Sequence, residues 1–176
     1  MPTKISAPRV YAACLASYNA GILHGAWVGC DQDEEGIMDE IKAMIAASPT
    51  PGAEEWAFHD FENFQGVEIG ENESAANLAD LGLFLSECEF GGALIQALSG
   101  NNRVEQAQEA LENYDGEFSS PEEWAEQTLT ETEALKGLPE DLRVYFDFKA
   151  YARDAELSGN IFTVEVNGSV HIFRNC

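Results

Sequence analysis

Acidic residues at alternating positions from residue 31 onward resemble the start of a calcium-binding loop. Asp31, Asp33 and Glu35 stand at the first, third and fifth positions of such a loop, and Gly36 stands at the sixth. The loop also requires a bidentate Glu at its twelfth position. Lys42 stands there, a cation where the bound ion needs an anion. We therefore interpret this segment as the exposed start of a helix and expect no calcium site.

Other residues that commonly bind metals or carry out catalysis lack the required spacing. The three histidines are far apart, at His24, His59 and His171. The four cysteines, Cys14, Cys30, Cys88 and Cys176, form no Cys-x-x-Cys pair, and we expect them to be reduced. The chain has no phosphate-binding loop, dinucleotide-binding motif or serine-hydrolase motif. We therefore predict a binding protein without metal or cofactor, and not an enzyme.

Two acidic blocks carry the net charge of −23. Residues 31–73 hold thirteen Asp or Glu against one Lys, and residues 104–141 hold twelve against one Lys. A surface with so large an excess of negative charge repels nucleic acid. It attracts proteins with basic clefts, such as those that bind DNA. Duplex DNA carries about one charge per 1.7 Å of axis, so 23 net charges correspond to roughly 40 Å of duplex.

Two other interpretations of this charge stay open at this point. An acidic surface can simply keep a protein in solution, or it can be an adaptation to high salt. The clustering of the acids in two blocks, instead of an even coat, speaks against adaptation to salt. The sharper hypothesis is that the chain imitates a polyanion.

The pattern of apolar residues predicts an α+β fold in three small domains. Residues 1–61 would form an antiparallel sheet with a helix, residues 62–102 a helical domain, and residues 103–176 an α+β domain with a hairpin. Neither a signal peptide nor an apolar run of about 20 residues is recognisable, so we expect a cytoplasmic protein.

Each domain has recognisable elements. In the first, we expect strands at residues 9–15, 22–28 and 56–61, and an acidic helix whose apolar stripe includes Ile37, Ile41, Met44 and Ile45. In the second, we expect helices at residues 74–87 and 93–98. In the third, we expect helices at residues 103–113 and 139–157, a helix that starts at Ser120 with a capping box closed by Glu123, and a hairpin that turns at Asn167 and Gly168.

Four stretches, in order along the chain, resemble the ArdA antirestriction family. The first covers residues 8–27, with the letters PRVYAACLASYNAG at its start, and the second covers residues 54–61. Residues 112–126 resemble the stretch called the antirestriction motif, and residues 151–162 resemble the C-terminal signature. The resemblance extends over nearly the full length of an acidic chain.

This resemblance implies a function. ArdA-like proteins are elongated, consist of three small domains, and form homodimers through the C-terminal domain. The dimer mimics bent B-form DNA and occupies the DNA-binding groove of type I restriction–modification enzymes, which consist of a methyltransferase core with a specificity subunit. Neither cofactor nor catalysis is involved, and neither nucleic acid nor a membrane is bound directly. Incoming plasmid or transposon DNA is thereby protected.

On this basis we predict which residues contact the partner. The carboxylates expected to imitate phosphates are Asp31, Asp33, Glu34, Glu35, Asp39, Glu40, Glu105, Glu109, Glu112, Asp115, Glu117, Glu122, Glu123 and Glu126. The motif residues expected to support dimer contacts are Tyr114, Gly116, Phe118, Trp124 and Ala125. Two rival functions stay open: a generic acidic adaptor for another basic protein, and an enzyme with a carboxylate-rich metal site.

Overall fold

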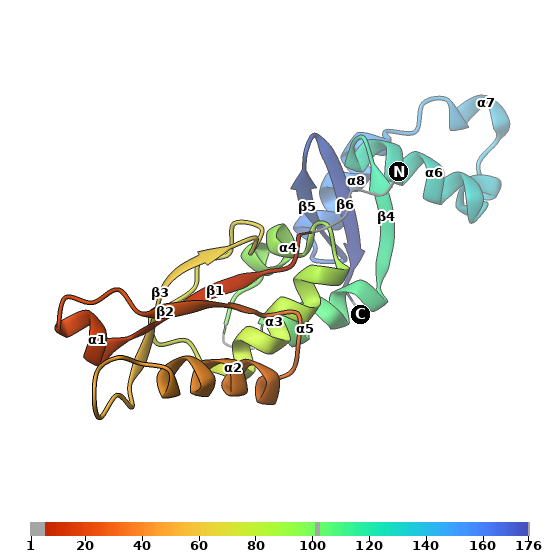
Figure 1. The fold of residues 1–176 in the computed structure, drawn as a ribbon. Helices are drawn as coiled ribbons and strands as arrows, with labels where there is room; N and C mark the ends of the chain where they lie inside the picture. Colours follow the sequence, from red (N-terminus) through yellow and green to blue (C-terminus); the bar gives the residue numbers. More distant parts are fainter. Residues whose placement is uncertain (1–5, 101–102, 176) are drawn as a thin grey trace. The chain divides into compact units, whose positions relative to one another are not determined.

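The computed structural model describes residues 6–100 and 103–175, and its contacts divide the chain into two compact units, Met1–Gln96 and Ala97–Cys176. Each unit contains a three-stranded antiparallel sheet and helices (Figure 1), so the expected α+β class is confirmed. The division into three domains stays a prediction.

The sheet of the first unit has the strand order β2-β1-β3. The central strand β1 (Arg9–Cys14) pairs with β2 (Gly25–Gly29) on one side and with β3 (Trp56–Glu62) on the other. Alternate side chains of β1, those of Val10, Ala12 and Cys14, are fully buried. Because side chains alternate between the two faces of a strand, these three lie on the face that forms the core.

Helix α2 (Glu34–Ala46) packs on this sheet through Ile37, Ile41 and Met44, the residues that the helical spacing predicts. Helix α3 (Ala75–Glu87) packs against α2 in turn, close to its expected bounds, and Ser74 is its N-cap. Helix α4 (Gly91–Ala97) follows, near its expected bounds.

The expected second strand was too long at its beginning. Residues 22–24 lie outside β2, and a short helix α1 (Leu15–Asn19) precedes them. The N–H of Ile22 donates to the carbonyl of Ser17, which closes the end of that helix. The backbone of Ile22 is therefore committed to the helix end, and pairing with β1 begins only at Gly25.

The sheet of the second unit has the order β4-β6-β5. Strands β5 (Ile161–Val166) and β6 (Ser169–Arg174) form the predicted hairpin, and both turn residues, Asn167 and Gly168, have positive φ, as a two-residue hairpin turn requires. Strand β4 (Tyr114–Phe118) was not predicted, because its Asp-Gly pair is typical of a turn. It pairs with the other side of β6.

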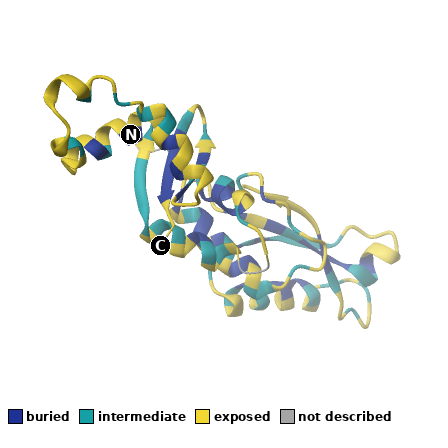
Figure 2. Ribbon diagram, turned by 180° about the vertical axis from the view of Figure 1, so that it is seen from behind, coloured by how far each residue is buried: buried dark blue, intermediate teal, exposed yellow. Residues whose placement is uncertain are grey.

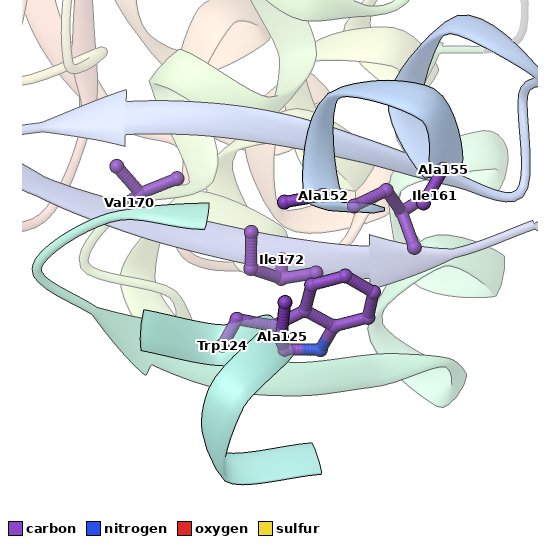
Figure 3. Close-up of a cluster of buried hydrophobic side chains, with 7 residues drawn as sticks. All are labelled: Trp124, Ala125, Ala152, Ala155, Ile161, Val170 and Ile172. Carbon is purple, nitrogen blue, oxygen red and sulfur yellow. The ribbon is translucent and has the colours of Figure 1, made fainter. Parts of the chain in front are cut away.

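Helices α6 (Pro121–Glu131) and α8 (Phe148–Leu157) pack together over one face of this sheet. The core between them and the sheet is a cluster of seven buried side chains (Figure 3): Trp124, Ala125, Ala152, Ala155, Ile161, Val170 and Ile172. Helix α5 (Arg103–Glu112) precedes β4, and it buries Ala107.

The single long helix expected at residues 139–157 was wrong. The structure has a short helix α7 (Glu140–Arg143), which follows a 3-10 turn η1 (Ala134–Gly137), and then a separate α8. The Asp147 side chain accepts a hydrogen bond from the backbone N–H of Ala150 at 2.8 Å and caps α8. Asp is a strong N-cap residue, and here it begins a new helix instead of continuing the old one.

Candidate partner-binding surface

The first group of predicted carboxylates lies on the solvent side of α2. Asp39 and Glu40 are exposed on the helix, while Ile41 beside them faces the core. Glu34 and Glu35 occupy its first turn, where the partial positive charge of the helix N-terminus favours anions. The outer side of this helix is exposed along its length (Figure 2).

The loop before α2 fixes the start of this acidic surface. Asp33 is the N-cap, and its carboxylate accepts a hydrogen bond from the Gly36 N–H at 2.8 Å. The Gln32 amide donates both to the Gly29 carbonyl at 2.8 Å and to the Glu40 carboxylate at 2.7 Å. Glu40 is therefore held in place while it stays exposed.

Lys42 is the single cation in the first acidic block, and it neutralises little of it. Its Nζ lies 3.3 Å from the Asp39 carboxylate, with both side chains about two-thirds exposed. An exposed pair of this kind contributes at most about 1 kcal/mol and is screened by salt. The surface of α2 consequently stays strongly negative.

The second group of carboxylates begins on α5. Glu105, Glu109 and Glu112 are exposed, and Ala107 is buried on the opposite side. Like charges three or four positions apart on a helix cost a few tenths of a kcal/mol per pair. The helix therefore carries this row of acids at a small cost to its own stability.

Helix α6 continues this group. Ser120 is its N-cap and accepts a hydrogen bond from the Glu123 N–H at 3.2 Å, as the capping box predicts. The Glu123 carboxylate, however, accepts from the N–H and hydroxyl of Ser119, at 2.7 and 2.6 Å. These hydrogen bonds lower the pKa of Glu123, because they favour the ionised form. Glu122 and Glu126 are exposed on the same helix.

Asp115 on β4 differs from the other predicted carboxylates. It is half-buried, whereas the remaining thirteen are exposed. Its Oδ2 accepts hydrogen bonds from Trp124 Nε1 and from Arg174 Nε, each at 2.7 Å. Glu117, two residues later on the same strand, is exposed. Sequence reasoning did not single out Arg174, and its distance of 59 residues from Asp115 left no local signal for the contact.

The other motif residues lie largely within the unit. Trp124 and Ala125 belong to the buried cluster, and Phe118 packs against it. The Tyr114 hydroxyl is hydrogen bonded to His171 Nδ1 at 2.7 Å. Burial lowers the pKa of His171, and the negative charge of Glu117 opposes that shift. The predicted role of these motif residues in dimer contacts stays a prediction.

Two observations concern the alternative of an enzyme with a carboxylate-rich metal site. Within residues 6–100 and 103–175, no group of three His, Cys, Asp or Glu side chains could hold a metal ion. A pocket of about 270 Å³ in the second unit has one carboxylate, that of Glu133, in its lining. No helix among the described residues has the length and apolar character needed to cross a bilayer.

Comparison with known protein families assigns the chain to a family. The family model described as antirestriction protein (ArdA) matches residues 10–169, nearly the whole chain. The chain belongs to the ArdA family. No curated protein matches it. Membership of the ArdA family indicates an antirestriction protein, whose interaction is with restriction–modification enzymes.

Proposed function

We propose that this ArdA protein inhibits type I restriction–modification enzymes by presenting carboxylates in place of DNA phosphates. The observation that carries this proposal is the exposure of thirteen of the fourteen predicted carboxylates, on helices, on a strand and in the loop before α2, all of which pack on buried cores. Lys and Arg side chains in the enzyme's groove, which bind phosphates, would contact these acids. Inhibition would then be competitive with DNA, and association would release counterions from both partners.

The finer aspects of this function belong to the same proposal. The partner is the methyltransferase core with its specificity subunit, and the inhibitor acts as a homodimer formed through the C-terminal part of the chain. It acts in the cytoplasm, without cofactor or catalysis, and protects the DNA of a mobile genetic element. The carboxylates imitate phosphates, which are the same in every DNA sequence, and do not imitate bases. Enzymes with different recognition sequences would therefore be inhibited alike.

Single and grouped neutral substitutions test the distribution of the charge. Glu109→Gln and Asp39→Asn should each weaken inhibition about 5-fold or less, since exposed pairs contribute at most about 1 kcal/mol each. Replacing Glu105, Glu109 and Glu112 together by Gln should weaken it on the order of 30-fold. The matched control replaces three exposed acids outside the predicted set: Asp80→Asn, Glu87→Gln and Glu165→Gln. A single neutral substitution at one of the thirteen exposed acids that abolishes inhibition would contradict the proposal.

Competition with DNA tests the mode of action. The apparent inhibition constant, measured with a purified type I enzyme, should rise in proportion to the concentration of duplex DNA. Capture from a bacterial lysate then identifies the partner. Recovery of methyltransferase and specificity subunits supports the proposal, whereas recovery of nucleoid proteins instead would favour a generic acidic adaptor.

A further inference from the structure

Asp115 is the extra residue of a β-bulge. Tyr114 pairs with Phe173 and Gly116 pairs with Ile172, so the register shifts between Tyr114 and Gly116 and leaves Asp115 without a partner on β6. Gly116 has a φ of 132°, which favours glycine. A bulge turns a side chain away from the direction that the regular strand would give it. Here the side chain is turned toward Trp124 and Arg174.

One oxygen of Asp115 therefore connects three elements of the second unit. Asp115 Oδ2, on β4, accepts from Trp124 Nε1 on α6 and from Arg174 Nε at the end of β6, each at 2.7 Å. The Arg174 N–H also donates to the carbonyl of Asn113, just before β4, at 3.0 Å. The Asp115 side chain is 20% exposed, and Trp124 is 4% exposed. We call Asp115, Trp124 and Arg174 the Asp115 clamp.

Two exposed acids of α6 lie on the side of the helix away from the clamp. Glu122 and Glu126 each lie two positions from Trp124, which places them about 200° around the helix from it. Both carboxylates are exposed, on the side of α6 opposite the indole that donates to Asp115. An acid that accepts two hydrogen bonds inside its own unit has less of its charge available to a partner than a fully exposed one.

We infer that Asp115 is a positioning residue: its carboxylate orients α6, and with it the exposed acids of that helix, and does not itself substitute for a phosphate. This inference rests on the proposed function. Asp115 was predicted to contact the partner directly, whereas this inference gives it an indirect role through the orientation of α6. The two roles can be told apart, because one depends on the charge of Asp115 and the other on its hydrogen bonds.

Two substitutions at the same position distinguish these effects. Asp115→Asn removes the charge but keeps a carbonyl oxygen where Oδ2 accepts both hydrogen bonds. Asp115→Ala removes the acceptor as well, and leaves two donors without it. We expect Asp115→Asn to weaken inhibition less than about 3-fold and Asp115→Ala about 10-fold or more. The control Glu165→Gln removes one exposed charge from β5 and should change inhibition less than about 2-fold.

A spectroscopic readout follows the clamp directly. The chain has three tryptophans, so Trp124→Phe assigns the indole N–H signal of Trp124 in a nitrogen–proton spectrum of the full chain. In the wild type this proton should exchange slowly with solvent. Asp115→Asn should retain the slow exchange, whereas Asp115→Ala should shift the signal and accelerate its exchange together with that of the α6 amides.

Either readout can overturn the inference. Asp115→Asn that inhibits as poorly as Asp115→Ala, with the Trp124 signal of the wild type, would make Asp115 a charge contact. An unchanged Trp124 signal in Asp115→Ala would show that the clamp does not hold α6. If Asp115→Ala does not fold, Asp115→Asn still separates the two roles. A wild-type protein that does not inhibit would refute the proposed function, while the exchange of the indole proton would still decide whether the clamp exists.

Discussion

Gly82 of α3 lies directly against the backbone of Cys30, which follows β2. A Cβ atom at Gly82 would overlap the carbonyl group of Cys30. Both residues are buried. This close approach joins α3 to the sheet that supports α2, and so to the structure that carries the first acidic surface.

Gly82→Ala should therefore destabilise the first unit. In an open helix position, alanine would gain up to about 1 kcal/mol over glycine. Here the added methyl group meets backbone atoms, which cannot swing aside, and we expect a net loss of about 2 kcal/mol or more. Chemical denaturation followed by circular dichroism measures it. Gly137→Ala is the control, because a Cβ there meets nothing within 4 Å. A gain in stability for Gly82→Ala would show that the backbone yields.

Gln65 makes a second contact that holds helices of the first unit together. Its amide donates to the carbonyls of Leu85 and Cys88, at 2.8 and 2.9 Å, and its side-chain oxygen accepts from the Gly92 N–H at 2.9 Å. The Cys88 carbonyl also accepts from the Gly91 N–H, so the Gln65 side chain and this bond together link the end of α3 to the first turn of α4.

Gln65→Ala should cost about 2–3 kcal/mol, since each hydrogen bond contributes about 1 kcal/mol. The substitution should also accelerate amide exchange at the start of α4. Hydrogen exchange of the full chain checks the position of the effect, and Gln96→Ala, at an exposed residue, is the control. If Gln65→Ala is as stable as Gln96→Ala, water replaces the hydrogen bonds of the Gln65 amide without loss of stability.

Local signals predicted the helices and the hairpin well, for identifiable reasons. Asn167 and Gly168 tolerate the positive φ that a tight hairpin needs, and Ser120 supplies the cap that starts α6. Where the prediction was wrong, a local pattern admitted two interpretations. Asp147 was placed inside a long helix although its side chain caps a new one.

The candidate site shows the same division between local and long-range information. Charged residues are rarely buried without a partner, so the exposure of acids such as Glu109 and Glu126 followed from residue type alone. Asp115 could not be assigned in this way. Its environment depends on Arg174 and on a strand that only tertiary pairing to β6 creates, and nothing near Asp115 in the sequence indicates either.

His171 makes the stability of the protein depend on pH. Burial lowers its pKa in the folded protein, so the unfolded chain binds a proton at a higher pH than the folded one does. The contribution of His171 to the stability of the folded state is therefore fully present above the ordinary histidine pKa of about 6.5. It is lost as the pH falls below that value, because the unfolded chain then binds the proton first. Glu117, which pairs with His171 across the strands, moderates the effect.

The comparison of wild type with His171→Asn isolates this contribution, because the other titrating groups are common to both proteins. The unfolding free energy of the wild type should exceed that of the variant by more at pH 7.5 than at pH 5.5. Denaturant titrations at both pH values measure it. A difference that is constant would mean that folding leaves the pKa of His171 unchanged, and one that grows toward acid pH would mean that folding raises it.

Ionic strength should control the affinity of the protein for its enzyme. Acids that imitate phosphates bind through charges, and salt screens exposed charges and reduces the gain from released counterions. We expect the affinity to fall on the order of 10-fold or more between about 50 and about 200 mM salt. Direct binding, measured without DNA, avoids the salt dependence of the enzyme's own contact with DNA.

The variant that lacks the charges of Glu105, Glu109 and Glu112 supplies the comparison. Its plot of log affinity against log salt should be shallower than that of the wild type, since fewer charge contacts form. The variant with Asp80, Glu87 and Glu165 neutralised has lost the same charge away from the proposed contact, and its slope should stay closer to the wild type. Slopes that are equally shallow in both variants would mean that net charge, and not a defined acidic surface, attracts the partner.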